Sequence, residues 1–352
     1  MNEQLTQYLR RRFPDADEIV VEEFMAIPGG FSRETYRFDV RMRRGGKVEH
    51  YPMILRKDPP KASAILHSNR QVEHELLEAV RRHTDLPVSE SYGFELDPAV
   101  FGEPAMLIQR MGGSGQTSNL FNDGPDANQA ESVITHLCEL IAALHLADLE
   151  KLNVRGILSD PRGVGVDPSS WDRYMETTFA YYVNSLDQVN FDPGLGSCYL
   201  DAFQTLRREK PRPLRLSLVH GDFNPANFLY ENGRVTALID WENSRVGDPR
   251  EDLGWMTSMD NMSNTQVMQY PKAKGGFLNY YNELTGFAVT QEEVNYFNLF
   301  GTCNIVVPVG SAVKRRFDRE HELLLHLYIV QPTIVNGLNF ARMLNYPIPA
   351  GG

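Results

Sequence analysis

The feature that most constrains the fold of this chain is an Asn232-Gly233 pair between two apolar runs that read as strands. Asn-Gly in this setting is the strongest short hairpin signal, because both residues accept the positive φ that a primed two-residue turn requires. A turn of that length also fixes which residues pair across the hairpin, beginning with Glu231 opposite Arg234. We therefore expect a tight antiparallel hairpin.

The register of this hairpin predicts where two polar side chains lie. Counting back from the turn places Asn227 opposite Leu238, which puts Asp240 on the same face as a diagonal neighbour of Asn227, within about 7 to 8 Å. A carboxylate and a carboxamide oxygen this close together suit magnesium, which prefers oxygen ligands. Asn227 and Asp240 are therefore candidate metal ligands.

The segment before the turn holds His220, Asp222 and Asn227 in the pattern His-x-Asp-x-x-x-x-Asn. In kinase catalytic loops an Asp at this spacing accepts the proton of the attacking hydroxyl, and the Asn binds magnesium. The alternative is an ordinary hairpin, in which Asp222 and Asn227 only make turn hydrogen bonds. A zinc hydrolase site on His220 and Asp222 is less well supported, since no second histidine cluster supplies further ligands.

Composition limits the class of protein. At 352 residues the chain exceeds what one core usually organises, so two lobes are expected. No stretch approaches the roughly 20 apolar residues of a spanning helix, no secretory signal is recognisable, and the three cysteines are scattered. A net charge of −11 opposes binding to a phosphate backbone. We expect a cytoplasmic protein without membrane or nucleic-acid partners, and the sequence leaves its oligomeric state open.

The pattern along the chain changes near residue 110. Before that point a short amphipathic helix opens the chain and strand patterns dominate. Strands are expected at 20–27, 35–42, 50–56 and 105–109, with a Gly45-Gly46 turn and a helix at 68–83. After a glycine cluster at 111–115, helices are expected at 128–148, 171–187, 197–209, 277–285, 291–300 and 318–345. The predicted fold class is α+β, with a small antiparallel sheet and one helix in residues 1–110 and a larger, mainly helical lobe in 111–352.

Two motifs resemble those of one enzyme superfamily. Residues 219–227 and 238–242 are similar to the H-G-D-x-x-x-x-N and I-D-W/F-E signatures of the aminoglycoside phosphotransferases and choline kinases. The resemblance implies a bilobal protein-kinase-like fold, in which the first lobe binds nucleotide and the second holds the catalytic residues. It also implies a kinase that uses ATP and Mg²⁺ to phosphorylate a hydroxyl group.

The resemblance assigns roles to the matching residues. It implies that Asp222 is the catalytic base, that His220 orders the catalytic loop, and that Asn227 and Asp240 bind magnesium. Asp252, further along, is expected to bond backbone groups of the catalytic loop.

In the first lobe, residues 27–36 resemble the loop that covers the nucleotide in this superfamily. Its Gly29 and Gly30 would let the backbone approach phosphates closely, and exposed amides near Ser32 could bind them. These three residues are candidate nucleotide contacts.

Arg56 stands where the superfamily usually has a lysine that pairs with the nucleotide phosphates. Strand alternation sends Lys57 to the opposite face, so Arg56 is the better candidate, and its fork can bind phosphate through two bonds. Glu73, in the next helix, resembles the glutamate that pairs with the strand cation. Glu75 lies two positions on and would point elsewhere, so only one of the two can serve.

The acceptor is expected to be a small molecule, because no activation segment with an A-P-E element follows Asp240. Residues 28–32 and 55–60 resemble kinase-like domains found beside acyl-CoA dehydrogenases, which implies hydroxyacyl substrates. The acidic net charge equally favours aminoglycosides or choline. A hypothesis of a different class is a nucleotide-binding pseudokinase that acts as an interaction module, suggested by Arg56 in place of lysine.

Overall fold

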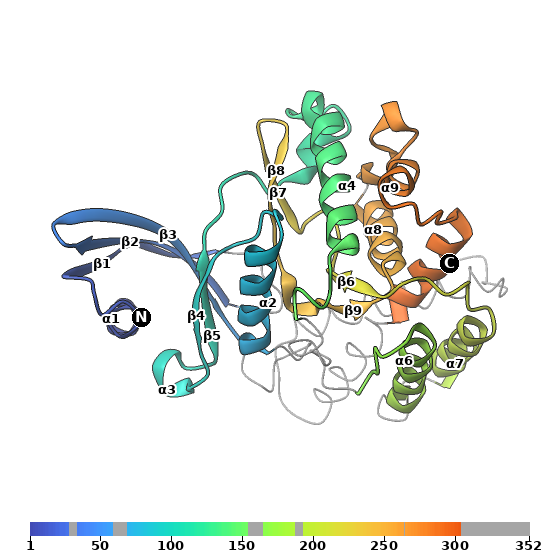
Figure 1. The fold of residues 1–352 in the computed structure, drawn as a ribbon, viewed down its shortest axis with the longest axis horizontal. Helices are drawn as coiled ribbons and strands as arrows, with labels where there is room; N and C mark the ends of the chain where they lie inside the picture. Colours follow the sequence, from blue (N-terminus) through green and yellow to red (C-terminus); the bar gives the residue numbers. More distant parts are fainter. Residues whose placement is uncertain (28–33, 59–68, 154–164, 187–192, 264, 304–352) are drawn as a thin grey trace.

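The computed structural model describes residues 1–27, 34–58, 69–153, 165–186, 193–263 and 265–303. Within them, a five-stranded antiparallel sheet is followed by a larger, mainly helical part (Figure 1). This arrangement confirms the predicted α+β fold class. The predicted helix at 318–345 and the loop residues Gly29, Gly30 and Ser32 lie outside the described residues.

The sheet has the strand order β1-β2-β3-β5-β4, which places β3 at its centre. The strands are β1 (Glu18–Ile27), β2 (Glu34–Arg44), β3 (Lys47–Lys57), β4 (Ser91–Glu95) and β5 (Ala105–Gln109). Gly45 and Gly46 form the predicted two-residue turn, with φ of 51° and 80°. Alternate side chains such as Phe38, Met53 and Leu55 are buried in one core cluster with the apolar stripe of α1 (Asn2–Arg12).

Helix α2 (Arg70–His83) lies between the sheet and the helical part (Figure 1). It begins at Asn69, whose side chain accepts hydrogen bonds from two amides of the first turn and so satisfies donors that the helix cannot. Leu76, Leu77 and Val80 share a core cluster with residues of α4 (Ala130–Leu146). Because α2 packs against both parts, it fixes the place of Glu73 relative to each.

The helical part contains the other predicted helices. Its side chains, such as Phe179, Tyr182 and Tyr281, are buried in two hydrophobic core clusters. The helices are α3 (Pro98–Phe101) beside the sheet, then α4, α6 (Trp171–Leu186), α7 (Pro193–Arg208), α8 (Arg250–Ser263) and α9 (Phe277–Thr285), with further helical residues at 291–303. The short strands are β6 (Ser217–Val219), β7 (Phe228–Glu231), β8 (Arg234–Leu238) and β9 (Arg245–Gly247).

The sequence patterns do not predict α8, β4, β6 or β9. Strands β6 and β9 have three residues each, too few to show an alternation. Helix α8 lacks a clear apolar stripe because it buries the charged Arg250, Glu251 and Asp252 at its start. A helix that buries charges escapes a search for apolar periodicity.

The segment between β5 and the helical part is anchored to the hairpin of β7 and β8. The backbones of Ser114 and Tyr230 exchange two hydrogen bonds, of 2.8 and 3.0 Å. Gly113, with φ of 112°, allows this approach, because a side chain there would collide with Thr236 and the Tyr230 carbonyl. The predicted lobe boundary at residue 110 falls at the start of this segment and remains a prediction.

This anchoring explains why the predicted hairpin register is wrong by one residue. Near the turn Glu231 pairs with Arg234 as expected, but a bulge follows, and Leu238 faces Phe228 instead of Asn227. Within the bulge the Thr236 hydroxyl donates a 2.6 Å hydrogen bond to the Gly112 carbonyl. The extra residue bonds the segment that follows β5. It shifts the strand pairing beyond the bulge by one position, so counting from the turn gives the wrong partner for Leu238.

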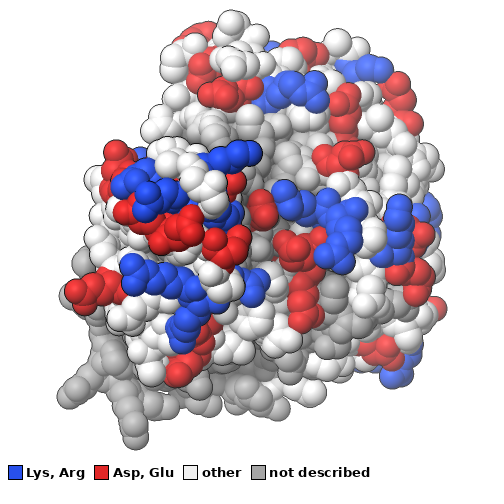
Figure 2. All heavy atoms as spheres, turned by 60° about the vertical axis from the view of Figure 1, so that its left-hand side comes forward, with Lys and Arg blue, Asp and Glu red and all other residues white. Residues whose placement is uncertain are grey.

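The basic cluster at 41–47 is paired with acids on the surface of the sheet. Arg41 contacts Glu22 at 3.2 Å, and Arg43 contacts Glu18 at 3.3 Å. Figure 2 shows Lys and Arg interspersed with Asp and Glu on the face that includes the sheet. None of the helices in the described ranges is both long and apolar enough to cross a membrane.

Two glycines test how closely α8 packs on the helical residues 291–303. A Cβ at Gly254 would collide with the backbone of Phe297 and Asn298, whereas one at Gly301 would lie 3.7 Å from the Trp255 ring, an ordinary contact. We expect Gly254→Ala to lower the free energy of unfolding by about 2 kcal/mol or more. Gly301→Ala should change it by less than about 1 kcal/mol, because alanine also favours the helix. Urea denaturation measures both, and equal losses would contradict the close packing.

Candidate active site

The catalytic loop after β6 is held in place by a buried carboxylate of α8. Asp252 accepts hydrogen bonds from the backbone N–H groups of His220, at 2.7 Å, and Gly221, at 2.9 Å. His145 contacts the same carboxylate at 3.0 Å. Burial alone would raise the pKa of Asp252, but the hydrogen bond and charge of His145 outweigh it and lower that pKa. Asp252 thus bonds the loop backbone, as the sequence predicts.

His220 is buried and contacts two segments of the site. Its Nε2 contacts the Ile239 carbonyl at 2.9 Å, and its Nδ1 lies 3.3 Å from the backbone nitrogen of Asp222. The ring therefore links the catalytic loop to the end of β8. This geometry fits the predicted loop-ordering role.

Position 221 requires a glycine because another segment of the chain comes close to its backbone. Its φ is 78°, and an added Cβ would collide with the Asn243 carbonyl and the guanidinium of Arg245. Asn243 belongs to the turn η3 (Trp241–Asn243), which follows directly on Asp240. The glycine therefore lets the two loops that hold Asp222 and Asp240 pack together.

The Asp222 carboxylate accepts three side-chain hydrogen bonds. Its Oδ1 accepts from Trp255 Nε1 at 2.7 Å and from Asn224 Nδ2 at 2.8 Å, and its Oδ2 accepts from Asn227 Nδ2 at 2.8 Å. Burial, followed by repulsion from Asp240, raises the pKa of Asp222 to about 7, and the three donors oppose that rise. A carboxyl group with a pKa near neutrality suits a general base.

Asn227 and Asp240 supply oxygen atoms at the same site. The amide nitrogen of Asn227 donates to the backbone carbonyl and to Oδ2 of Asp222, both at 2.8 Å, so its amide oxygen is the atom left to face a cation. Asp240 has φ of 70°, an uncommon value for a residue other than glycine and one often found at functional sites. Two oxygen donors of this kind fit magnesium. Among the residues described, no cluster of three His, Cys, Asp or Glu side chains could hold a metal.

Arg56 is bound by three carboxylates, one from α2 and two from the turn after β8. Its Nη1 donates to Glu73 Oε1 at 2.7 Å, and its Nη2 donates to Asp240 and, at 3.3 Å, to Glu242. Burial would lower the pKa of the guanidinium, but these carboxylates outweigh burial and raise it. The predicted pairing of Arg56 with Glu73 is therefore present. Glu75 instead accepts a 2.8 Å hydrogen bond from Gln71.

A second buried arginine extends this network beyond what the sequence analysis found. Arg70 Nη1 donates to Glu73 Oε2 at 2.6 Å, and its Nε donates to Asp58 at 2.7 Å. Each carboxylate oxygen of Glu73 therefore faces one arginine. The only sequence signal is the three-residue spacing of Arg70 and Glu73 on a helix.

Other contacts at the site also escaped the sequence analysis. Glu242 lies inside the 238–242 motif, and Asn224 lies two positions after Asp222, so a closer reading of the motifs could have found both residues. Trp255 reaches Asp222 from another element, 33 positions along the chain, so the motif around Asp222 does not point to it.

Comparison with known proteins gives the family. A sequence profile described as the phosphotransferase enzyme family matches residues 23–287, which is more than half of the chain. The chain belongs to the phosphotransferase enzyme family. The superfamily resemblance of the catalytic motifs is thereby confirmed.

Relatives and solved structures agree with this membership. Acyl-CoA dehydrogenase family member 11 of Gallus gallus is 24% identical over 333 residues, which cover 87% of this chain but only 39% of that protein. The fold is similar to the aminoglycoside phosphotransferase APH(4)-Ia in complex with ADP and hygromycin B, with a TM-score of 0.60 and 18% identity over 99% of this chain and all of that one. It is also similar to the GDP complex of aminoglycoside 2'-phosphotransferase-IIIa, with a TM-score of 0.60, 14% identity and coverage of 96% of this chain and 99% of that one.

The close approach at Gly221 can be tested against a glycine of matched backbone conformation. Gly46 has φ of 80° with nothing within 4 Å of an added Cβ, so Gly46→Ala should cost only the about 1 to 2 kcal/mol of a left-handed alanine. Gly221→Ala adds a collision and should cost at least about 2 kcal/mol more. Thermal and urea unfolding measure both. Similar losses for the two variants would contradict the packing of the loops.

The three-carboxylate contact of Arg56 also has a matched control. Arg56→Met would remove the guanidinium that contacts Glu73, Asp240 and Glu242, so we expect a loss of about 3 kcal/mol or more in unfolding free energy. Arg110, whose side chain is 31% exposed, pairs with Asp39 at 2.8 Å on the surface. Arg110→Met should cost less than about 1 kcal/mol. Urea denaturation distinguishes these outcomes, and a small effect of Arg56→Met would mean that the buried carboxylates are not held by Arg56.

Proposed function

We propose that this chain transfers the γ-phosphoryl group of ATP to a hydroxyl group of a small molecule, in a magnesium-dependent reaction. The observation that supports this most is the Asp222 carboxylate, whose pKa is raised to about 7 by burial and by Asp240 and whose oxygens are oriented by three donors. Membership in the phosphotransferase enzyme family agrees with the reaction class.

Asp222 is the proposed base. As the acceptor oxygen attacks the γ-phosphorus and the bond to the ADP oxygen breaks, the acceptor proton would pass to the Asp222 carboxylate. ADP leaves with the electron pair of the broken bond. His220 and Asp252 hold the loop backbone, so Asp222 need not be repositioned during transfer.

Asn227 and Asp240 are the proposed ligands of magnesium, which when bound would neutralise charge on the phosphates. Arg56 is the proposed phosphate contact, with Glu73 holding one side of its guanidinium. Its other nitrogen contacts Asp240 and Glu242, so nucleotide binding would exchange one of these carboxylates for phosphate. Gly29, Gly30 and Ser32 remain proposed contacts in the loop that covers the nucleotide.

The acceptor class is proposed from the relatives and the charge of the chain. Similarity to acyl-CoA dehydrogenase family members favours a hydroxyacyl compound, whereas the hygromycin B bound to APH(4)-Ia and the net charge of −11 favour a cationic aminoglycoside or choline. A cytoplasmic location and a division into a nucleotide lobe, 1–110, and a catalytic lobe, 111–352, belong to the same proposal. The pseudokinase alternative is weakened by the presence of Asp222, Asn227 and Asp240 together with the Arg56 contact to Glu73.

Two isosteric variants test the roles. Asp222→Asn should bind ATP with magnesium about as well as the wild type and lose turnover by about 10² to 10⁴-fold, because only the base is removed. Asp240→Asn should weaken magnesium-dependent ATP binding as well, because a charged ligand is lost. Asp39→Asn, on the surface of the sheet, is the control and should leave both quantities unchanged. ADP release with hydroxyacyl, aminoglycoside and choline acceptors, and calorimetry for binding, provide the measurements.

Two results would contradict the proposal. One is a mild, equal effect of Asp222→Asn and Asp240→Asn on turnover. The other is ATP binding without turnover on any acceptor or water, together with recovery of a stable protein partner, which would favour the pseudokinase.

A further inference from the structure

The two oxygens of Asp222 are not equivalent in the structure. Oδ1 accepts from Trp255 and Asn224, whereas among the described residues Oδ2 accepts one side-chain hydrogen bond, from Asn227. A carboxylate oxygen has about two lone-pair positions, so two donors fill those of Oδ1. Only Oδ2 keeps a position for another hydroxyl.

The two groups at Oδ1 both present N–H donors to the carboxylate. The indole nitrogen of Trp255 donates and has no lone pair to accept with. The amide oxygen of Asn224 already accepts a 2.8 Å hydrogen bond from the backbone nitrogen of Ala226. An acceptor hydroxyl that approached Oδ1 would therefore meet the N–H groups that already occupy that oxygen.

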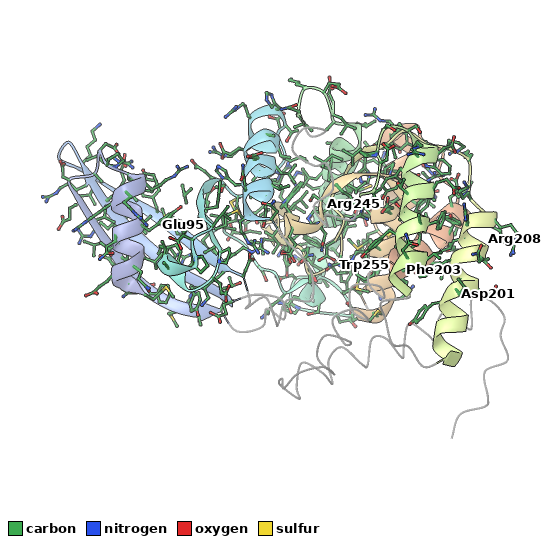
Figure 3. The ribbon with its side chains drawn as sticks, turned by 90° about the horizontal axis from the view of Figure 1, so that it is seen from below. Glu95, Asp201, Phe203, Arg208, Arg245 and Trp255 are labelled. Carbon is green, nitrogen blue, oxygen red and sulfur yellow. The ribbon has the colours of Figure 1, made fainter. Side chains whose placement is uncertain are left out.

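The ring of Trp255 is held by the packing of two helices. Trp255 follows Gly254 on α8, where the absence of a side chain lets the backbone of residues 297 and 298 come close. On the helix that contains those residues, a Cβ at Gly301 would lie 3.7 Å from Cε3 of Trp255, so the ring rests against that helix. Figure 3 shows Trp255 within the helical part, where its side chain is partly buried. The same α8 carries Asp252, which holds the loop backbone, so one helix fixes both the loop and its carboxylate.

We propose that Trp255 is a positioning residue, whose indole N–H locks the Asp222 carboxylate so that Oδ2 receives the acceptor hydroxyl. The proposal rests on the proposed function. The terminal torsion of an aspartate is otherwise broad, so loss of this donor would let the carboxylate plane rotate away from this orientation. In the transfer itself the acceptor proton goes to Oδ2, the acceptor oxygen bonds to phosphorus, and ADP leaves with the electron pair of the broken bond.

The chain offers a matched control for the indole donor. Trp171 Nε1 donates to Asp248 Oδ2, also at 2.7 Å, in a buried contact away from Asp222. Each Trp→Phe variant keeps an aromatic ring and removes one indole-carboxylate hydrogen bond. We expect Trp255→Phe to lower kcat about tenfold or more, with KM for ATP within about twofold of wild type, because Trp255 contacts the base. Trp171→Phe should leave kcat per folded molecule within about twofold, even where it lowers stability.

The kinetics would use ATP and magnesium with the most active acceptor of the panel, or with water. A second readout does not depend on activity or on the folding of Trp255→Phe. The chain has three tryptophans, so a nitrogen-proton correlation spectrum holds three indole signals. Trp171→Phe and Trp241→Phe assign two of them, and the third belongs to Trp255. Asp222→Ala should shift the Trp255 indole signal and leave that of Trp171 in place.

Each outcome decides the proposal. A Trp255 signal that Asp222→Ala does not move would remove the contact on which the proposal stands. A moved signal with kcat of Trp255→Phe close to wild type, or an equal loss of kcat in both Trp→Phe variants, would reduce Trp255 to a structural residue while the proposed function stands. A wild-type protein with no turnover would instead overturn the proposed function, and the positioning role with it.

Discussion

The ion pairs of Arg56 are the interaction on which the site depends. One guanidinium on the central strand of the sheet contacts Glu73 from α2 and both Asp240 and Glu242 from the turn after β8. These carboxylates would repel one another without it, and burying charges is tolerated only when each has a partner. Arg70 and Asp58 continue the pairing on the far side of Glu73. The sheet, α2 and the catalytic hairpin are therefore placed relative to one another by charge.

In the helical part, a second buried carboxylate fixes the position of the loop that contains Asp222. Asp252 holds the backbone of the catalytic loop, His145 holds Asp252, and the Tyr281 hydroxyl contacts the other nitrogen of His145 at 2.8 Å. Because this chain of contacts begins in α4 and α9 and ends at the loop, the position of Asp222 depends on the packing of the helices. The ion pairs of Arg56 on the side of the sheet and the hydrogen bonds of Asp252 on the side of the helices therefore position the same site.

Local signals predicted those parts of the fold that neighbouring residues decide. The Gly45-Gly46 turn and the stripe of α4 follow from backbone conformation and apolar periodicity, which are properties of short segments. The register beyond the bulge could not be predicted, because a hydrogen bond from Thr236 to the linker sets it. Helix α8 escaped prediction for a related reason, since partners elsewhere in the chain stabilise its buried charges.

The sequence by itself determined which polar groups the site contains. The spacing of His220, Asp222 and Asn227, with Asp240 after the hairpin, predicts a base and oxygen ligands for a cation. Only the tertiary structure decided how these groups are oriented. Arg56 meets Asp240 across 184 positions and Trp255 meets Asp222 across 33, and both contacts result from packing between elements. Residues so far apart share no local pattern, because their proximity exists only after the helices and the sheet have assembled.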